Sequence, residues 1–213
     1  MNVFAKWLGS ILGLLMAVVV SGCAVSYPPL PPEADVPEDY TYIIGPGDSV
    51  QMFVWGNPEV TQSVVVRPDG KITAPLVEEL PASGKTPYEL ARDVEKELSK
   101  YVRNPLVTII VSGFVGPYSE QVRVVGEIGS GDEGEVRPMA IPYKEEMTLL
   151  DLMIAVGGLT HFADGNRASL IRVIDGEMNQ FGIRVEDLIE DGDITANVDI
   201  MPGDILFIPE AYF

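Results

Sequence analysis

The sequence predicts an α+β protein in which two small domains follow one another, each a mixed β-sheet with one or two covering helices. Short runs rich in β-branched residues are bounded by Gly, Pro and Asp, which is typical of strands and turns. Two segments carry helix start signals, and 213 residues suffice for two domains of ordinary size. The predicted segments are 1–22, 23–40, 41–114 and 115–213.

The first apolar run, residues 7–20, stops just before Cys23, the only cysteine of the chain. A run of about 14 residues has signal-peptide length and is shorter than the about 18 that a membrane-spanning helix needs. With Ser21 and Gly22 before the cysteine, the segment resembles a bacterial lipoprotein signal, in which Cys23 is acylated and becomes the first mature residue. An ordinary secretory signal followed by a buried cysteine is the alternative.

Acylation of Cys23 would make the mature chain a peripheral membrane protein, because two or more acyl chains anchor a protein stably to a bilayer. Ala24 follows the cysteine, where an aspartate marks inner-membrane retention in such lipoproteins. The resemblance therefore implies the periplasmic face of the outer membrane.

The chain is strongly acidic, with 32 Asp and Glu against 14 Lys and Arg and a net charge of −18. Such a surface repels phosphate backbones, and no basic stripe offsets it, so no nucleic-acid partner is expected. Solubility alone explains the acidity.

Residues 27–40 combine five prolines with four acidic residues, a composition that favours extended polyproline II. This segment is expected to be a semi-rigid tether that holds the first domain a short distance from the lipid.

The first domain is expected to open with strands at 42–44, 50–54 and 63–67. Gly45-Pro46-Gly47-Asp48 forms a turn between the first two, because proline presets one φ and glycine accepts a positive one. Pro68-Asp69-Gly70 is expected to join 64–67 to 71–74 as a β-hairpin.

A helix begins at Thr86, with Pro87 at its first position and Glu89 completing a capping box. Apolar residues at 90, 94 and 98 lie on one face, so this helix covers a sheet on one side only. Asn104-Pro105 ends the segment, and 106–111 is expected to be a buried strand.

The second domain begins near 113–120 and starts with a strand at 121–128, followed by a loop at 129–135. Thr148 caps a helix at 149–156, which is apolar nearly all round and is expected to be largely enclosed. Gly157-Gly158 ends it with a left-handed C-cap. Strands at 168–174 and 178–184 flank a turn at 175–176, and a short helix from 185 and a strand at 205–208 complete the domain.

Residues that could carry chemistry are sparse. His161 is the only histidine, which excludes a two-histidine metal site and leaves few choices for a general base. Asp164-Gly165-Asn166 and Asp191-Gly192-Asp193 lack the continuation of a calcium-binding loop and are expected to be tight turns. No catalytic residue, metal or cofactor is expected, which favours a binding or structural role.

Several segments of the first domain together carry a family likeness. Residues 42–48, 66–72 and 86–105 resemble the export domain of bacterial polysaccharide export lipoproteins, over residues 40–112. In the second domain, residues 124–128, 147–151 and 157–160 resemble the β-grasp domain called SLBB that follows it in that family. Residues 141–168 are most similar to the exosortase-linked exopolysaccharide exporters.

The resemblance implies a ring-shaped homo-oligomer, octameric by analogy, through which a polysaccharide leaves the cell with no bond made or broken. It implies an inner-membrane chain-length co-polymerase as a partner. Since the chain stops soon after its last strand, without the long pore helix of some members, a separate outer-membrane β-barrel is expected to supply the pore. The alternative hypothesis is a monomeric adaptor or sensor that binds a soluble ligand. A third hypothesis is a glycan-cleaving enzyme.

The resemblance also assigns residues to roles. It implies that one set of residues in the export domain acts in the fold and in subunit contacts. It implies that a second set forms a motif of the β-grasp domain. The first set is Gly45, Pro46, Gly47, Asp48, Arg67, Pro68, Asp69 and Gly70, and the second is Gly126, Glu127, Gly157 and Gly158. The chain departs from the family at Glu78, where a glycine is common, and at 129–135, which looks like an insertion. Pro202-Gly203-Asp204 repeats the Pro46-Gly47-Asp48 sequence ahead of the last strand.

Overall fold

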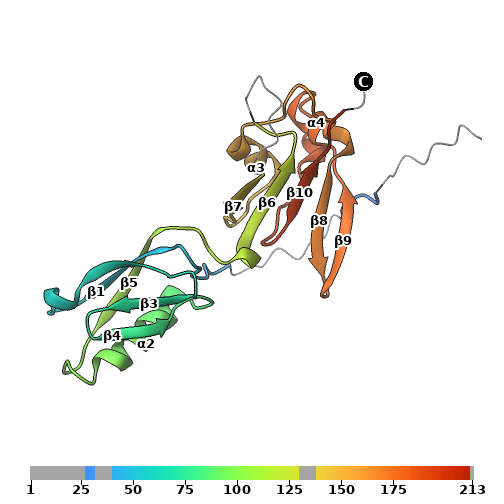
Figure 1. The fold of residues 1–213 in the computed structure, drawn as a ribbon. Helices are drawn as coiled ribbons and strands as arrows, with labels where there is room; N and C mark the ends of the chain where they lie inside the picture. The colour runs from blue at the N-terminus through green and yellow to red at the C-terminus, as the bar shows by residue number, and fades with distance from the viewer. Residues whose placement is uncertain (1–26, 32–39, 130–137, 212–213) are drawn as a thin grey trace, which may run out of the picture.

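A computed structural model describes residues 27–31, 40–129 and 138–211. Cys23, the expected signal, most of the expected tether and most of the 129–135 loop lie outside these residues. Figure 1 shows two separate groups of strands, joined by the segment that leads from β5 to β6. Helices and strands are both well represented, as the α+β prediction requires.

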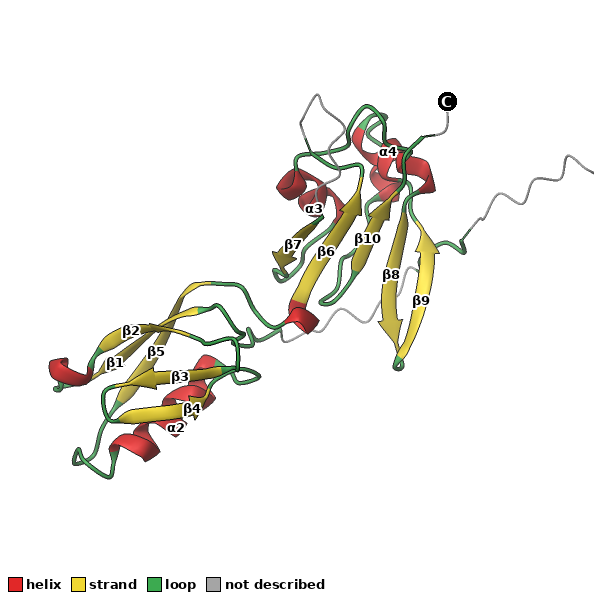
Figure 2. Ribbon diagram, in the orientation of Figure 1, coloured by secondary structure: helices red, strands yellow, loops and turns green. Residues whose placement is uncertain are grey.

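The first group of strands forms two small antiparallel sheets (Figure 2). One has the order β2-β1-β5, and the other pairs β3 with β4. The bounds are β1 Ser49–Val54, β2 Gln62–Val65, β3 Lys71–Ala74, β4 Val77–Pro81 and β5 Val107–Gly113, with a 3₁₀ turn at Pro58–Val60. No pairing here is parallel, unlike the mixed sheet that was predicted. Short connections join β1 to β2 and β3 to β4, which requires antiparallel pairing, and β5 also returns antiparallel to β1.

Helix α2, Pro87–Leu98, confirms the predicted helix and its start signal. The Thr86 hydroxyl accepts from the backbone N–H of Glu89, and the Glu89 carboxylate accepts from the backbone N–H of Thr86, so the capping box is complete. Its apolar stripe, which includes Leu90, Val94 and Leu98, packs on the core-facing side of β1 and β5. That side carries Val50, Met52 and Val54, all at most 1% exposed.

Three further expectations for the first domain are wrong in detail. Residues 42–44 form no strand, since only Ile44 pairs, with the backbone of residues 84 and 85. The 67–70 turn closes as expected, but β2 pairs with β1 and β3 pairs with β4, so no β2–β3 hairpin forms. β5 is buried on one face only, because Ile110 is 47% exposed on the other.

The second group of strands is a single mixed sheet of order β7-β6-β10-β8-β9. β10 runs parallel to β6, and all other neighbours are antiparallel. This order, with a parallel central pair, is the expected β-grasp arrangement. The bounds are β6 Gln121–Gly126, β7 Met139–Pro142, β8 Ser169–Ile174, β9 Glu177–Gly182 and β10 Ile205–Ile208, with α3 Leu149–Val156, α4 Val185–Ile189 and 3₁₀ turns at Tyr118–Glu120, Gly165–Arg167 and Ile194–Ala196.

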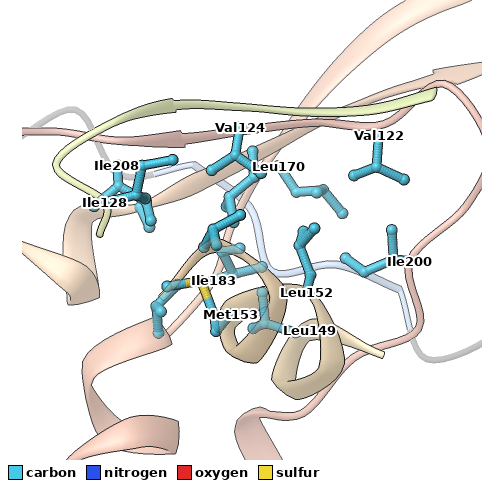
Figure 3. Packing of buried hydrophobic residues seen from close by; sticks show 14 of the residues in the cluster. Val122, Val124, Ile128, Leu149, Leu152, Met153, Leu170, Ile183, Ile200 and Ile208 are labelled. Atoms are coloured by element: carbon cyan, nitrogen blue, oxygen red, sulfur yellow. The ribbon is translucent and has the colours of Figure 1, made fainter. Parts of the chain in front are cut away.

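Helix α3 packs against one face of this sheet (Figure 3). Leu149, Leu152 and Met153 are fully buried and meet strand residues such as Val124 and Leu170. The helix is not largely enclosed as predicted, because Ile154 is 70% exposed on its outer side. The predicted C-cap is confirmed at Gly157, which has a φ of 90°.

The described part of the N-terminal segment lies against the second sheet. The N–H of Gly182, at the end of β9, donates to the carbonyl of Pro28 at 2.8 Å, and Pro29 forms a parallel bridge with Gly182. Leu30 packs on the core of the second domain, and Tyr40 meets Tyr143 edge to face at 5.0 Å. Residues 27–31 are therefore docked on the second domain rather than being a free spacer ahead of the first.

Candidate functional site

The Gly45-Pro46-Gly47-Asp48 turn directly precedes β1. Gly47 has a φ of 94°, and the N–H of Asp48 donates to the carbonyl of Gly45 at 3.2 Å, which makes a proline–glycine turn of type II. The Asp48 carboxylate folds back over this turn, where its Oδ2 accepts from the N–H of Gly45 at 2.9 Å. This hydrogen bond within the turn fixes the position of the Asp48 carboxylate.

Asp48 also ties the turn to the segment that leads into the second sheet. It is fully buried, and its Oδ1 accepts from the backbone N–H groups of Val115 at 2.7 Å and Gly116 at 2.9 Å. The Tyr42 hydroxyl donates to its Oδ2 at 2.7 Å. We call Tyr42, Gly45, Asp48, Val115 and Gly116 the junction clamp.

Gly45 belongs to the junction clamp because no side chain fits at this position. A Cβ there would lie 2.0 Å from the carbonyl carbon of Gly116. The backbones of the turn and the connecting segment touch directly, so the clamp requires glycine for close approach.

The tyrosines near the junction are held in their neutral form. Burial, followed by the hydrogen bond to Asp48, raises the pKa of Tyr42 well above its usual range. Burial and the negative charge of Glu120 raise the pKa of Tyr40 to about 12.

These pKa shifts predict alkaline destabilisation. The unfolded chain releases the tyrosine protons at about pH 10, whereas the folded chain retains them, so their stabilising contribution is complete below about pH 10 and is lost as the pH rises towards 12. We expect Tyr40→Phe/Tyr42→Phe to show a smaller fall in the denaturant midpoint between about pH 9 and 11. Tyr118→Phe is the control, because Tyr118 is 78% exposed. Its denaturant midpoint should fall as much as that of the wild type.

A second turn of the same design precedes β10. In Met201-Pro202-Gly203-Asp204, Gly203 has a φ of 84° and the N–H of Asp204 donates to the carbonyl of Met201 at 3.2 Å. The Asp204 carboxylate accepts from the N–H of Met201 at 2.8 Å, as Asp48 accepts from Gly45. The two Pro-Gly-Asp sequences therefore build the same local structure at the start of a central strand.

Asp204 uses its carboxylate to hold Arg172, which projects from β8. The two side chains form a bidentate pair, with Nε to Oδ1 at 2.9 Å and Nη2 to Oδ2 at 2.6 Å. Both are buried, at 4% and 1% exposed, and Nη2 also donates to the carbonyl of Asp199. The pair fixes the 199–204 loop to β8.

Comparison with known proteins gives two family matches. Residues 36–112 match the family described as polysaccharide biosynthesis/export protein, and residues 133–182 match the SLBB domain. The chain contains a polysaccharide-export domain followed by an SLBB domain. The junction clamp thus joins the turn before β1 of the export domain to the segment that leads into the SLBB sheet.

Two curated relatives are similar to most of this chain. The EPS I polysaccharide export outer membrane protein EpsA of Ralstonia nicotianae is 25% identical over 192 residues, which covers 79% of this chain and 47% of the relative. Its namesake in Ralstonia solanacearum is 25% identical over 188 residues, covering 78% and 47%. The chain spans about half the length of these relatives.

The Arg67-Pro68-Asp69-Gly70 turn lies on the surface of the export domain. Arg67 pairs with Asp69 at 2.7 Å, with both side chains more than 40% exposed, so the pair adds little stability. The hydrogen bond from Lys71, with Arg67 nearby, holds the pKa of the Glu79 carboxyl below its usual range. The carbonyl of Gly70 accepts from the N–H groups of residues 82 and 83, which ties the turn to the end of β4. A role of the 67–70 turn in subunit contact stays a prediction.

The predicted β-grasp motif residues gather at one end of the SLBB domain. Gly126 touches β10, since a Cβ there would lie 1.8 Å from the carbonyl oxygen of Ile208. Glu127 is buried, and its Oε2 accepts from the Thr160 hydroxyl at 2.7 Å. The carbonyl of Gly158 accepts from the N–H of Gly129, so the loop after α3 is fastened to the end of β6. These contacts hold the end of β6 against β10 and against the loop after α3.

Within residues 27–31, 40–129 and 138–211, no group of three or more His, Cys, Asp or Glu side chains is placed to hold a metal ion. His161 is exposed. Among these same residues, no helix has the length and apolar character needed to cross a membrane.

The sequence alone missed Tyr42, Val115 and Gly116 as partners of Asp48, and Arg172 as the partner of Asp204. The repeated Pro-Gly-Asp was the available signal, since an aspartate after such a turn faces back over it. Most of the other groups that the two carboxylates bind lie far away in the sequence. The N–H groups of Val115 and Gly116 are 67 and 68 residues from Asp48.

Proposed function

We propose that this chain acts in the export of an extracellular polysaccharide, as a lipid-anchored subunit of a ring on the periplasmic face of the outer membrane. The glycan passes through the ring with no bond made or broken. The observation that carries the proposal is the joint occurrence, in family order, of a polysaccharide-export domain and an SLBB domain. The relatives named as outer membrane export proteins support it.

Membrane attachment through Cys23 gives the proposed subunit an orientation. Tyr27 comes shortly after Cys23 in the sequence, and the chain between them spans at most about 14 Å when extended. The next residues dock at the end of β9, beside Gly182. A lipid anchor at Cys23 would therefore hold this end of the SLBB sheet close to the bilayer.

The export domain lies at the other end of the SLBB sheet. β9 runs parallel to β6, because β8 is antiparallel to both β9 and β10, and β10 is parallel to β6. The connecting segment enters at the start of β6, whereas the anchored segment docks at the end of β9, as Figure 1 also shows. In this orientation the export domain points into the periplasm, towards the proposed inner-membrane chain-length co-polymerase, and the pore is supplied by a separate outer-membrane partner.

Deletion of the gene tests the proposal. We expect the deletion strain to lose surface polysaccharide, and the wild-type chain to restore it. Cys23→Ala should fail to incorporate a palmitate analogue and should restore export poorly. Unchanged surface polysaccharide in the deletion strain would refute the function, and labelling of Cys23→Ala would refute the anchor.

A further inference from the structure

The β2-β1-β5 sheet of the export domain has one face that nothing covers among the described residues. Helix α2 packs on the face that carries Val50 and Met52, so the alternate residues of each strand point the other way. The strand registers place Gln51, Phe53, Ser63, Val65, Thr108 and Ile110 together on this second face, which we call the open face. Trp55 continues the line of Gln51 and Phe53 just beyond β1.

The open face carries apolar side chains that are largely exposed. Val65 is 59% exposed, Trp55 57% and Ile110 47%. The two aromatic rings are ordered, because Phe53 and Trp55 meet edge to face at 5.0 Å and the indole N–H donates to the Thr108 hydroxyl at 3.2 Å. Large exposed apolar areas with fixed aromatic side chains are typical of protein interaction surfaces.

The open face is also uncharged, although the chain has a net charge of −18. None of its residues is Asp, Glu, Lys or Arg, whereas the outer side of α2 carries Arg92, Asp93 and Lys96. Two copies of an acidic chain repel one another wherever their carboxylates approach, and physiological salt largely screens this repulsion only beyond about 8 Å. A surface without carboxylates is therefore where a second copy can approach at the lowest electrostatic cost.

We infer that a second copy of this chain packs on the open face of the export domain. The inference rests on the ring proposed above and assigns it a contact surface. Val65 and Ile110 argue for a protein partner rather than a glycan, because aliphatic carbon offers glycan hydroxyls no hydrogen bond but gains from burial against another apolar surface. In a ring this face meets a different surface of the next copy, so the contact is heterologous.

A charge placed on the open face tests the inference. We expect the full chain in a zwitterionic detergent to assemble as its concentration rises, and light scattering coupled to size-exclusion chromatography measures this assembly. Ile110→Lys and Val65→Lys should each raise the concentration needed for assembly at least tenfold, because each buries an unpaired charge in the contact. Both positions are more than 40% exposed, so the variants should keep the wild-type circular dichroism and melting temperature.

Tyr118→Lys is the matched control, since Tyr118 is 78% exposed and lies outside the sheet. It should assemble as the wild type does. Assembly of Ile110→Lys and Val65→Lys at the wild-type concentration would overturn the inference, and so would a wild-type chain that stays monomeric at the highest attainable concentration.

A glycan partner is distinguished by fluorescence. Trp7 lies in the expected signal, so Trp55 is the only indole of the chain from Cys23 onward. A change in its fluorescence when dextran is added to the monomeric chain would overturn the inference in favour of a glycan surface.

Failure of this inference and failure of the proposed function give different results. If Ile110→Lys assembles normally while export still requires the chain, only the contact surface is wrong. If Ile110→Lys stays monomeric while deletion leaves export unchanged, only the function is wrong.

Discussion

Replacing Asp48 by alanine is expected to destabilise the export domain by about 3 kcal/mol or more. The substitution leaves the N–H groups of Gly45, Val115 and Gly116 without their acceptor at a buried site. Each buried polar group that loses its partner costs about 1–3 kcal/mol, and hydrogen bonds to a charged group are the stronger kind. Guanidinium denaturation of the chain from Cys23 onward, in which Trp55 is the only tryptophan, measures the free energy of unfolding through the fluorescence of that residue.

Asp48→Asn should recover only part of this loss. Its amide oxygen can accept at one side, but the amide NH₂ then faces backbone or hydroxyl donors at the other side. The Tyr42 hydroxyl can rotate to accept, whereas the N–H of Gly45 cannot. We therefore expect Asp48→Asn to lie between the wild type and Asp48→Ala.

Tyr42→Phe serves as the mild comparison, with an expected loss of about 1 kcal/mol for one hydrogen bond. The Asp48 carboxylate keeps its three backbone donors in that variant. Equal losses for Tyr42→Phe and Asp48→Ala would contradict the assignment of the junction clamp to the backbone contacts.

The helices were predictable because their signals are local. Thr86 and Glu89 lie three residues apart, and Thr148 and Asp151 repeat the arrangement at α3, so each capping box can be read from a single turn of chain. The same holds for Gly157, whose left-handed φ ends α3. Local chemistry decides these features with little help from the rest of the fold.

Strand pairing was less predictable because it is decided at a distance. The 67–70 turn has the local hydrogen bonds of a hairpin turn, yet β2 and β3 leave it for different sheets. β4 was missed because Val77-Glu78-Glu79-Leu80-Pro81 shows no clear alternation and ends in proline. β7, Met139–Pro142, was missed for a similar reason, since a four-residue strand on the edge of a sheet has little pattern of its own.

In the candidate site, too, the local contacts were predictable and the long-range contacts were not. Asp48 and Gly45 were identified from the turn sequence, which fixes the bond between them. Their contacts with Val115 and Gly116 depend on how the connecting segment returns past the turn, and no spacing in the sequence encodes that path. The docking of residues 27–31 on β9 was missed because a proline-rich composition predicts extension but not what the extended chain lies against.

Replacing Arg172 by methionine is expected to destabilise the SLBB domain by about 3–5 kcal/mol, because it leaves the Asp204 carboxylate buried without its counter-charge. Asp204→Asn should be costly for the converse reason, since the guanidinium then stays buried opposite a neutral amide. Hydrogen exchange of the β8 and β10 amides reports the local free energy of opening in each variant.

Arg184→Met is the control for the Arg172 substitution. Arg184 also pairs with two carboxylates, those of Asp187 and Asp193, but its side chain is 49% exposed. Water screens such pairs, so the loss should be small beside that of Arg172→Met.

The double variant Arg172→Met/Asp204→Asn decides what the buried pair contributes. Removing both partners leaves no unpaired charge, and the amide oxygen introduced by Asp204→Asn can still accept from the N–H of Met201. The pair is also incompletely satisfied, because Nη1 of Arg172 is buried with no hydrogen-bond partner among the described residues. Replacing an imperfect buried ion pair by neutral groups of similar size is often close to neutral. We therefore expect the double variant to be more stable than Arg172→Met alone, whereas strictly additive losses would show that the two side chains act independently.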